Sequence, residues 1–146
     1  MNQSLIVSQS ITVNAPVEKV WNALTDPAII AEYLFSTETI TDWKVGSEII
    51  FQGVYGDNKE FSYRDRGIIL ENIFNQTISY SYWSGFTGLE DKPGNYATVT
   101  YTLKRIDDDH TGFTWTQKGF ATEAGYQHSL NGMPAFLEQI KAIMER

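Results

Sequence analysis

Near its C-terminus the chain reads YQHSLNGMPAFLEQIKAIM, residues 126–144. Apolar side chains recur in this segment every three or four positions, which is the spacing of one face of an α-helix. The members of this stripe are Tyr126, Leu130, Met133, Leu137, Ile140 and Met144. We therefore expect a long amphipathic helix whose apolar face packs against the part of the chain that precedes it.

Pro134 lies inside this helical pattern, two positions after Gly132. A proline ring removes one backbone hydrogen bond and bends a helix, and glycine weakens the same turn. The pattern leaves two alternatives open: the helix is kinked at Pro134, or it begins near Asn131. A kink over a sheet would let a pocket open or flex, whereas a tolerated bend would have no role.

Between residues 48 and 117 apolar and polar side chains alternate with period two, as they do in half-buried strands. The expected strands cover residues 48–55, 61–71, 78–82, 98–103 and 113–117. Polar turns are expected at residues 57–58, 75–76 and 107–109, and a long loop at residues 84–95. Strands joined by short turns pair as antiparallel hairpins, so this region predicts an antiparallel sheet.

The N-terminal part predicts one strand and two short helices. Residues 5–13 form the strand, and Asn14-Ala15-Pro16 starts a helix, with Asn14 as its N-cap. Asp26-Pro27 repeats that start signal and predicts a second helix through Tyr33. The order of strand, two helices, strands and long helix predicts an α+β fold.

The chain has 146 residues, which favours one domain over residues 1–146 with a core that needs no disulfide or metal. It has no cysteine, so disulfides, thiol catalysis, thiolate metal sites and iron–sulfur clusters are excluded.

The net charge is −7 at pH 7, and no basic stripe is present, so nucleic acid and anionic membrane surfaces are poor partners. Residues 1–12 lack the basic start and apolar core of a signal peptide. No apolar run approaches the roughly 20 residues of a membrane helix. We expect a soluble, cytoplasmic protein without membrane insertion, and the sequence leaves the oligomeric state undetermined.

Aromatic residues make up 14% of the chain and are concentrated in the expected strands. If Ile69 and Ile78 face inward, the alternation places several tyrosines on the same face. The expected pocket lining consists of Tyr33, Leu34, Phe51, Tyr55, Phe61, Tyr63, Asp65, Ile69, Tyr80, Tyr82, Tyr101, Trp115, Met133 and Leu137. Such an interior either fills with side chains or holds one small ligand. Because tyrosine combines apolar surface with a hydroxyl, we favour a pocket for a small hydrophobic or aromatic molecule.

Asp65 is the acidic residue that the alternation places inward, between Tyr63 and Gly67. A buried carboxylate has a raised pKa or a specific partner, so Asp65 could act as an acid or orient a ligand. Two other interpretations remain. A β-bulge near Gly67 could reverse the register, or Asp65 could lie at a wet rim beside Arg64 and Arg66.

Other candidate chemistry is weak. Asp107, Asp109 and His110 could be imagined as a metal site, but adjacent residues rarely converge on one ion, and we expect a solvated hairpin tip instead. The sequence contains no Ser–His–Asp arrangement, phosphate loop or paired-histidine zinc motif. We therefore name no catalytic residue other than the candidate Asp65, and we expect no metal and no cofactor.

The segment APVEKVWNALTDP, residues 15–27, resembles the opening motif of the helix-grip superfamily, which includes START lipid-transfer domains, pollen allergens and polyketide cyclases. Within it, the chain is most similar to the family named for the activator of heat-shock protein 90 ATPase. The supporting stretches are GSE (46–48), GIILE (67–71), ISYSY (78–82), ATVTYTL (97–103) and QKGF (117–120).

The resemblance implies a curved antiparallel sheet wrapped around the long C-terminal helix, with two short helices after the first strand and a cavity between sheet and helix. It leaves three functions open. These are binding of a small hydrophobic, lipid-like or polyketide-like molecule, a role as accessory factor of a heat-shock chaperone in the stress response, and a cyclase-like or aromatase-like enzyme in which Asp65 protonates the substrate. We favour the first and leave catalysis open.

The chain also departs from the family pattern. Family members often carry Gly-Trp in the last helix, where this chain has Gly132-Met133, a change that would enlarge or soften the pocket. The eukaryotic co-chaperones have a separate N-terminal domain that helps to hold the chaperone, and we expect no room for it in 146 residues.

Overall fold

The computed structural model describes residues 5–146. Within this range seven strands form one antiparallel sheet in the order β1-β7-β6-β5-β4-β3-β2. The strands are β1 (Ile6–Val13), β2 (Glu38–Ile40), β3 (Glu48–Tyr55), β4 (Phe61–Ile73), β5 (Thr77–Tyr82), β6 (Ala97–Asp107) and β7 (His110–Lys118). The helices are α1 (Val17–Thr25), α2 (Pro27–Tyr33) and α3 (Glu123–Glu145), and two short 3-10 turns are η1 (Gly85–Thr87) and η2 (Pro93–Asn95). The predicted α+β class is confirmed.

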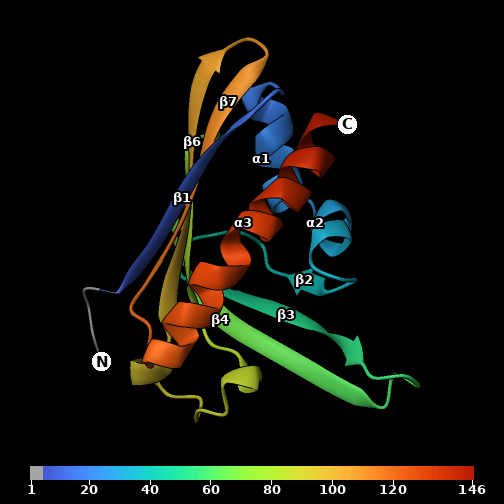
Figure 1. Ribbon diagram of the computed structural model, residues 1–146, viewed down its shortest axis with the longest axis vertical. Coiled ribbons are helices and arrows are strands. Elements are labelled where there is room, and N and C mark those ends of the chain that lie inside the picture. The colour runs from blue at the N-terminus through green and yellow to red at the C-terminus, as the bar shows by residue number, and fades with distance from the viewer. Residues whose placement is uncertain (1–4) are drawn as a thin grey trace.

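The long helix α3 crosses the concave face of the curved sheet, and α1 and α2 pack near its C-terminal half (Figure 1). The β3–β4 hairpin extends away from α3 at the other side of the sheet (Figure 1). This arrangement confirms the expected sheet around a C-terminal helix. Within residues 5–146, none of the helices combines the length and apolarity needed to cross a bilayer.

The helix α3 is one continuous helix through Pro134, so the alternative start near Asn131 is wrong. It begins earlier than the apolar stripe, because the side chain of Thr122 caps it by accepting a hydrogen bond from the backbone N–H of Gly125 at 3.0 Å. Four residues of the predicted stripe are buried: Met133, Leu137, Ile140 and Met144. Leu130 is exposed, whereas Tyr126 is partly buried and packs against Phe120 of the core.

The predicted cap of α1 is wrong. Pro16 occupies the N-cap position and makes no side-chain cap, while the backbone N–H of Asn14 donates to the Glu145 carboxylate at 2.7 Å. This contact joins the start of α1 to the end of α3, a pairing that local sequence does not reveal. The second start signal is confirmed, since the Asp26 side chain accepts from the N–H of Ala28 at 2.9 Å.

Further differences concern strands. The strand β6 reaches Asp107 and β7 begins at His110, so their hairpin is longer than the expected 98–103 and 113–117. The strand β4 reaches Ile73, two residues beyond its expected end. The three-residue strand β2 was not predicted, because a segment this short shows no periodicity and is a strand only through its pairing with β3. The differences in β2 and β4 extend the β2–β3–β4 side of the sheet.

Candidate ligand-binding site

Aromatic rings from four strands line the concave face of the sheet. They belong to Phe51 on β3, Tyr80 and Tyr82 on β5, Tyr101 on β6 and Trp115 on β7. The register pairs Tyr101 with Trp115 across β6 and β7, and the ring centroids of Phe51 and Tyr80 lie 5.7 Å apart. The alternation therefore predicted which side chains share this face.

Tyrosine hydroxyl groups on this face bond to partners inside the protein. The hydroxyls of Tyr80 and Tyr101 are 2.9 Å apart, and the Tyr33 hydroxyl on α2 donates to the carbonyl of Ala23 at 2.9 Å. Removal from water raises the pKa of Tyr101 to about 12 and raises the pKa values of Tyr33, Tyr80 and Tyr82 further. These hydroxyls therefore stay protonated at neutral pH and can donate hydrogen bonds.

Phe136 on α3 packs over the aromatic rings of the concave face, and the sequence analysis did not predict it. Its ring centroid lies 5.1 Å from that of Trp115 and 6.0 Å from that of Tyr33. It follows Met133 by three positions, so helical spacing could have identified it. The indole Nε1 of Trp115 is buried there and has no hydrogen-bond partner among the described residues.

The other predicted lining residues from this part of the molecule are apolar. Ile69, Met133 and Leu137 are buried in the core, and Leu34 packs against it at the C-terminal end of α2. They supply the apolar surface beside the aromatic rings.

Asp65 points inward, as the alternation predicted, and is only 6% exposed. It pairs with Phe51 in the β3–β4 register, and its Oδ2 accepts a hydrogen bond from the Tyr82 hydroxyl at 2.8 Å. Its Oδ1 is buried and has no partner among the described residues. The register shift of β4 lies at Leu70, beyond Gly67, so it leaves the inward direction of Asp65 unchanged. The two alternative interpretations of Asp65 are therefore wrong.

Three of the predicted lining residues lie in a separate group at the far end of the β3–β4 hairpin. Tyr55, Phe61 and Tyr63 cluster there with Phe86 of η1, with ring centroids 5.1 Å to 6.3 Å apart. Tyr55, Phe61 and Phe86 are 44%, 51% and 63% exposed. Phe86 lies in a loop where alternation carries no signal, so the sequence analysis missed it. We call these four residues the hairpin-end cluster.

Two hollows of the described chain lie outside the space between the sheet and α3. The larger, of about 390 Å³, is an open depression lined by Ile40, Thr41, Asp42, Ser47, Glu48 and Ile50. The smaller, of about 130 Å³, is lined by Lys19, Asn22, Ala23, Ile29, Ile143, Met144 and Arg146. The predicted cavity over the concave face therefore stays a prediction.

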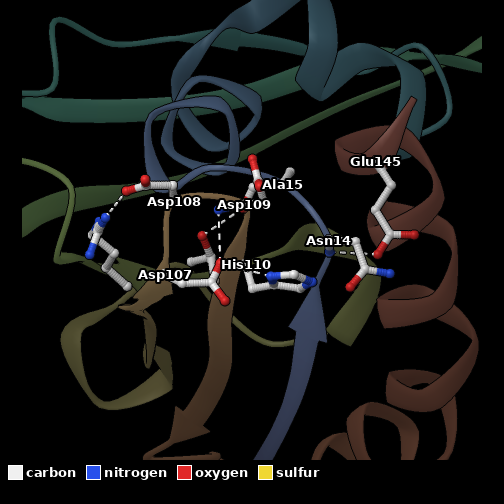
Figure 2. Close-up of polar contacts among 9 residues, drawn as sticks. Asn14, Ala15, Asp107, Asp108, Asp109, His110 and Glu145 are labelled. Atoms are coloured by element: carbon white, nitrogen blue, oxygen red, sulfur yellow. Dashed lines mark hydrogen bonds and ion pairs between the residues drawn. The ribbon is translucent and has the colours of Figure 1, made fainter.

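The tip of the β6–β7 hairpin uses its acidic residues for local structure (Figure 2). One oxygen of Asp107 accepts hydrogen bonds from the backbone N–H of Asp109 and from the His110 ring, at 2.8 Å and 2.7 Å. The Thr111 hydroxyl donates to the carbonyl of Ala15 at 2.9 Å and so fastens the hairpin to the start of α1. In residues 5–146 no group of three His, Cys, Asp or Glu side chains is placed to hold a metal ion.

The family described as Activator of Hsp90 ATPase homolog 1-like protein matches residues 14–145. The chain belongs to this family. The predicted resemblance is confirmed over almost the whole length of this family member. No curated protein matches the chain.

Solved structures share the fold. The solution structure of ChR145 from Cytophaga hutchinsonii is 38% identical, with a TM-score of 0.81 over 99% of this chain and 96% of that one. PFC0360w, an HSP90 activator from Plasmodium falciparum, is 18% identical, with a TM-score of 0.73 over 95% of each chain. CalU16 from Micromonospora echinospora is 22% identical, with a TM-score of 0.68 over 95% of this chain and 74% of that one.

Proposed function

We propose that this protein binds a small apolar or aromatic molecule between the concave face of the sheet and α3. The observation that carries the proposal is the Trp115 indole N–H, a buried donor under Phe136 that has no acceptor among the described residues. A buried donor without an acceptor costs free energy, so an oxygen of a ligand at this point would be stabilising.

The surroundings of Trp115 support this ligand class. The wall combines apolar area with tyrosine hydroxyls, which is the usual composition of sites for small organic molecules. A ligand could displace the Phe136 side chain, which is only partly buried, rather than a strand of the sheet. We expect the ligand to fill this space through its apolar part and to accept a hydrogen bond from the indole.

The first test is native mass spectrometry of the protein purified from its own host, with a denatured control. An added mass that is lost on denaturation supports the proposal and gives the mass of the ligand. The same protein is then screened against a library of apolar and aromatic compounds by isotope-edited NMR. We expect binders to shift the Trp115 indole signal first.

Two tryptophan variants make this test specific. Trp115→Phe should weaken binding several-fold because it removes the donor while keeping a ring. Trp83→Phe is the matched control, because the Trp83 indole already donates to the carbonyl of Leu89 at 3.2 Å. A bare protein mass together with no compound that shifts concave-face signals would reject the proposal.

A second candidate function is that of an accessory factor for a heat-shock chaperone. The family description favours it, and the exposed hairpin-end cluster is an apolar surface of the kind that marks protein contacts. A pull-down against the chaperone of the host and a measurement of its ATPase rate test this function. Phe86→Ser should abolish retention, and absence of both retention and rate change with the unaltered protein would reject it.

A further inference from the structure

Asp65 is a buried carboxylate without a basic partner. Strand alternation turns its neighbours Arg64 and Arg66 to the opposite face, where Arg66 pairs with Glu48 at 2.5 Å. Among residues 5–146 no lysine, arginine or histidine forms an ion pair with Asp65, and its single hydrogen bond comes from Tyr82. A carboxylate in such surroundings is stabilised by any group that brings positive charge and a proton donor to Oδ1.

Two aromatic residues are direct neighbours of Asp65, and a third aromatic ring contacts both of them. Phe51 is its cross-strand neighbour, Tyr82 donates to it, and Tyr80 contacts both of these rings. The centroid distances are 5.7 Å for Phe51–Tyr80, 6.0 Å for Phe51–Tyr82 and 6.5 Å for Tyr80–Tyr82. One point can lie within about 6 Å of all three centroids, and a cation at that distance is attracted where it lies over the face of a ring.

The carboxylate and the rings favour the same kind of group. We propose that Asp65 with Phe51, Tyr80 and Tyr82 binds the protonated amine of an otherwise apolar or aromatic ligand. This inference rests on the proposed function and specifies one end of its ligand. The ammonium group donates to Oδ1 of Asp65, and its charge faces the rings.

Other ligand groups fit these residues less well. A carboxylate or phosphate would be repelled by Asp65, and a ketone has no proton to donate. A hydroxyl could donate to Oδ1 but would leave the negative charge without a counter-charge. A metal ion would need several oxygen ligands, whereas no group of three His, Cys, Asp or Glu side chains in residues 5–146 is placed to hold one.

The test compares three probes of similar shape: naphthylmethylamine, naphthylmethanol and ethylnaphthalene. Their affinities are measured by calorimetry on the full chain at neutral pH, where the amine is charged. We expect the amine to bind about tenfold more tightly than the hydrocarbon, with the alcohol between them. Equal affinities for the amine and the hydrocarbon would overturn the inference.

Asp65→Asn removes the charge with little change in shape. It should lower the affinity for the amine about tenfold and leave the affinity for ethylnaphthalene within about twofold. The matched control is Glu138→Gln, which removes an exposed negative charge from α3 and should change neither. If Glu138→Gln also lost its preference for the amine, the preference would arise from the overall charge of the protein. That outcome would contradict specific binding of the amine at Asp65.

Tyr82→Phe keeps the inference testable if Asp65→Asn does not fold. It retains the ring and removes the hydrogen bond to Asp65, so the amine preference should persist or increase. Disappearance of the preference in this variant would overturn the inference. If ethylnaphthalene binds and the amine binds no more tightly, only the inference about Asp65 fails and the proposed function stands. If none of the probes binds, the inference fails too, and the library screen by itself decides the proposed function.

Discussion

On β6, Thr100 and Thr102 lie on the convex face of the sheet, whereas Val99, Tyr101 and Leu103 lie on the concave face that α3 covers. The backbone is the same, and only the alternation separates the two faces. Both faces carry hydroxyl groups: those of the convex face belong to serines and threonines, whereas the concave face also carries the hydroxyls of Tyr80, Tyr82 and Tyr101.

Hydroxyl groups of the convex face pair with one another across strands. The distances are 3.1 Å for Ser8–Thr116, 2.7 Å for Ser10–Thr114 and 3.1 Å for Ser79–Thr100. On the concave face, by contrast, Trp115, Asp65 and Thr39, which is the cross-strand neighbour of Phe51, each retain a buried polar atom with no partner among the described residues. Water can satisfy a missing bond on the convex face at little cost, so unpaired groups are informative about ligands only on the concave face.

The largest expected difference between the faces is in packing. Phe113→Ala on the concave side of β7 should lower the free energy of unfolding by about 3–5 kcal/mol, because the ring is fully buried. Its neighbour Thr114→Ala, on the convex side, should cost about 1 kcal/mol or less. Urea unfolding followed by circular dichroism measures both values. Similar losses for the two variants would contradict the division into a packed and a solvated face.

The next largest expected loss of stability comes from a substitution at Gly67, where two backbone segments lie close together. A Cβ added there would lie 1.6 Å from the carbonyl oxygen of Ser81, so Gly67→Ala should lower the free energy of unfolding by about 2–3 kcal/mol. Gly132→Ala on exposed α3 is the control, because its Cβ meets nothing within 4 Å and alanine favours helix by about 0.5–1 kcal/mol. Chemical denaturation should therefore give opposite signs. A stable Gly67→Ala protein would show that β4 and β5 can separate.

High pH should weaken the concave face. The pKa of Tyr101 is raised from 10.0 in the unfolded chain to about 12 in the folded one by removal from water, so its contribution is complete below pH 10 and is lost as pH rises toward 12. The unfolding free energy should fall above pH 10 by up to about 1.4 kcal/mol per pH unit for each such tyrosine. Denaturation curves measured from about pH 8 to about pH 11 test this prediction. Tyr101→Phe should make the fall in unfolding free energy less steep. An unchanged slope would place Tyr101 in water.

The smallest effect concerns the paired hydroxyls of the convex face. A double-mutant cycle of Ser10→Ala and Thr114→Val should give a coupling energy of about 0.5 kcal/mol, as for other cross-strand hydroxyl pairs. A coupling above about 1.5 kcal/mol would exceed the usual range of such pairs and would mean that this face is less hydrated than the comparison assumes.

Local patterns predicted most of the elements. Period-two alternation identified β3, β5 and the inward direction of Asp65, because successive side chains of a strand point to opposite faces. The Asp26-Pro27 cap also follows from local chemistry alone. The failure at Asn14 has a different cause, since its backbone N–H is satisfied by Glu145 from the other end of the chain.

The candidate site also shows that local patterns cannot predict contacts between distant parts of the chain. Alternation placed Tyr55 and Phe61 on the same face as Tyr80, but it could not show that the β3–β4 hairpin carries them away from α3 into the exposed hairpin-end cluster (Figure 1). Phe86 joined that cluster through a loop, where no period exists. Distance from a covering helix is a property of the folded sheet.

The sequence by itself determined the fold class, the identity of the two faces and the family, because strand and helix periods and the order of short motifs can be read directly along the chain. Only the tertiary structure decided which inward side chains α3 covers and which polar atoms, among them Asp65 Oδ1 and Trp115 Nε1, have no partner in residues 5–146. Hydrogen-bond satisfaction depends on groups distant in sequence, so no local pattern can report it.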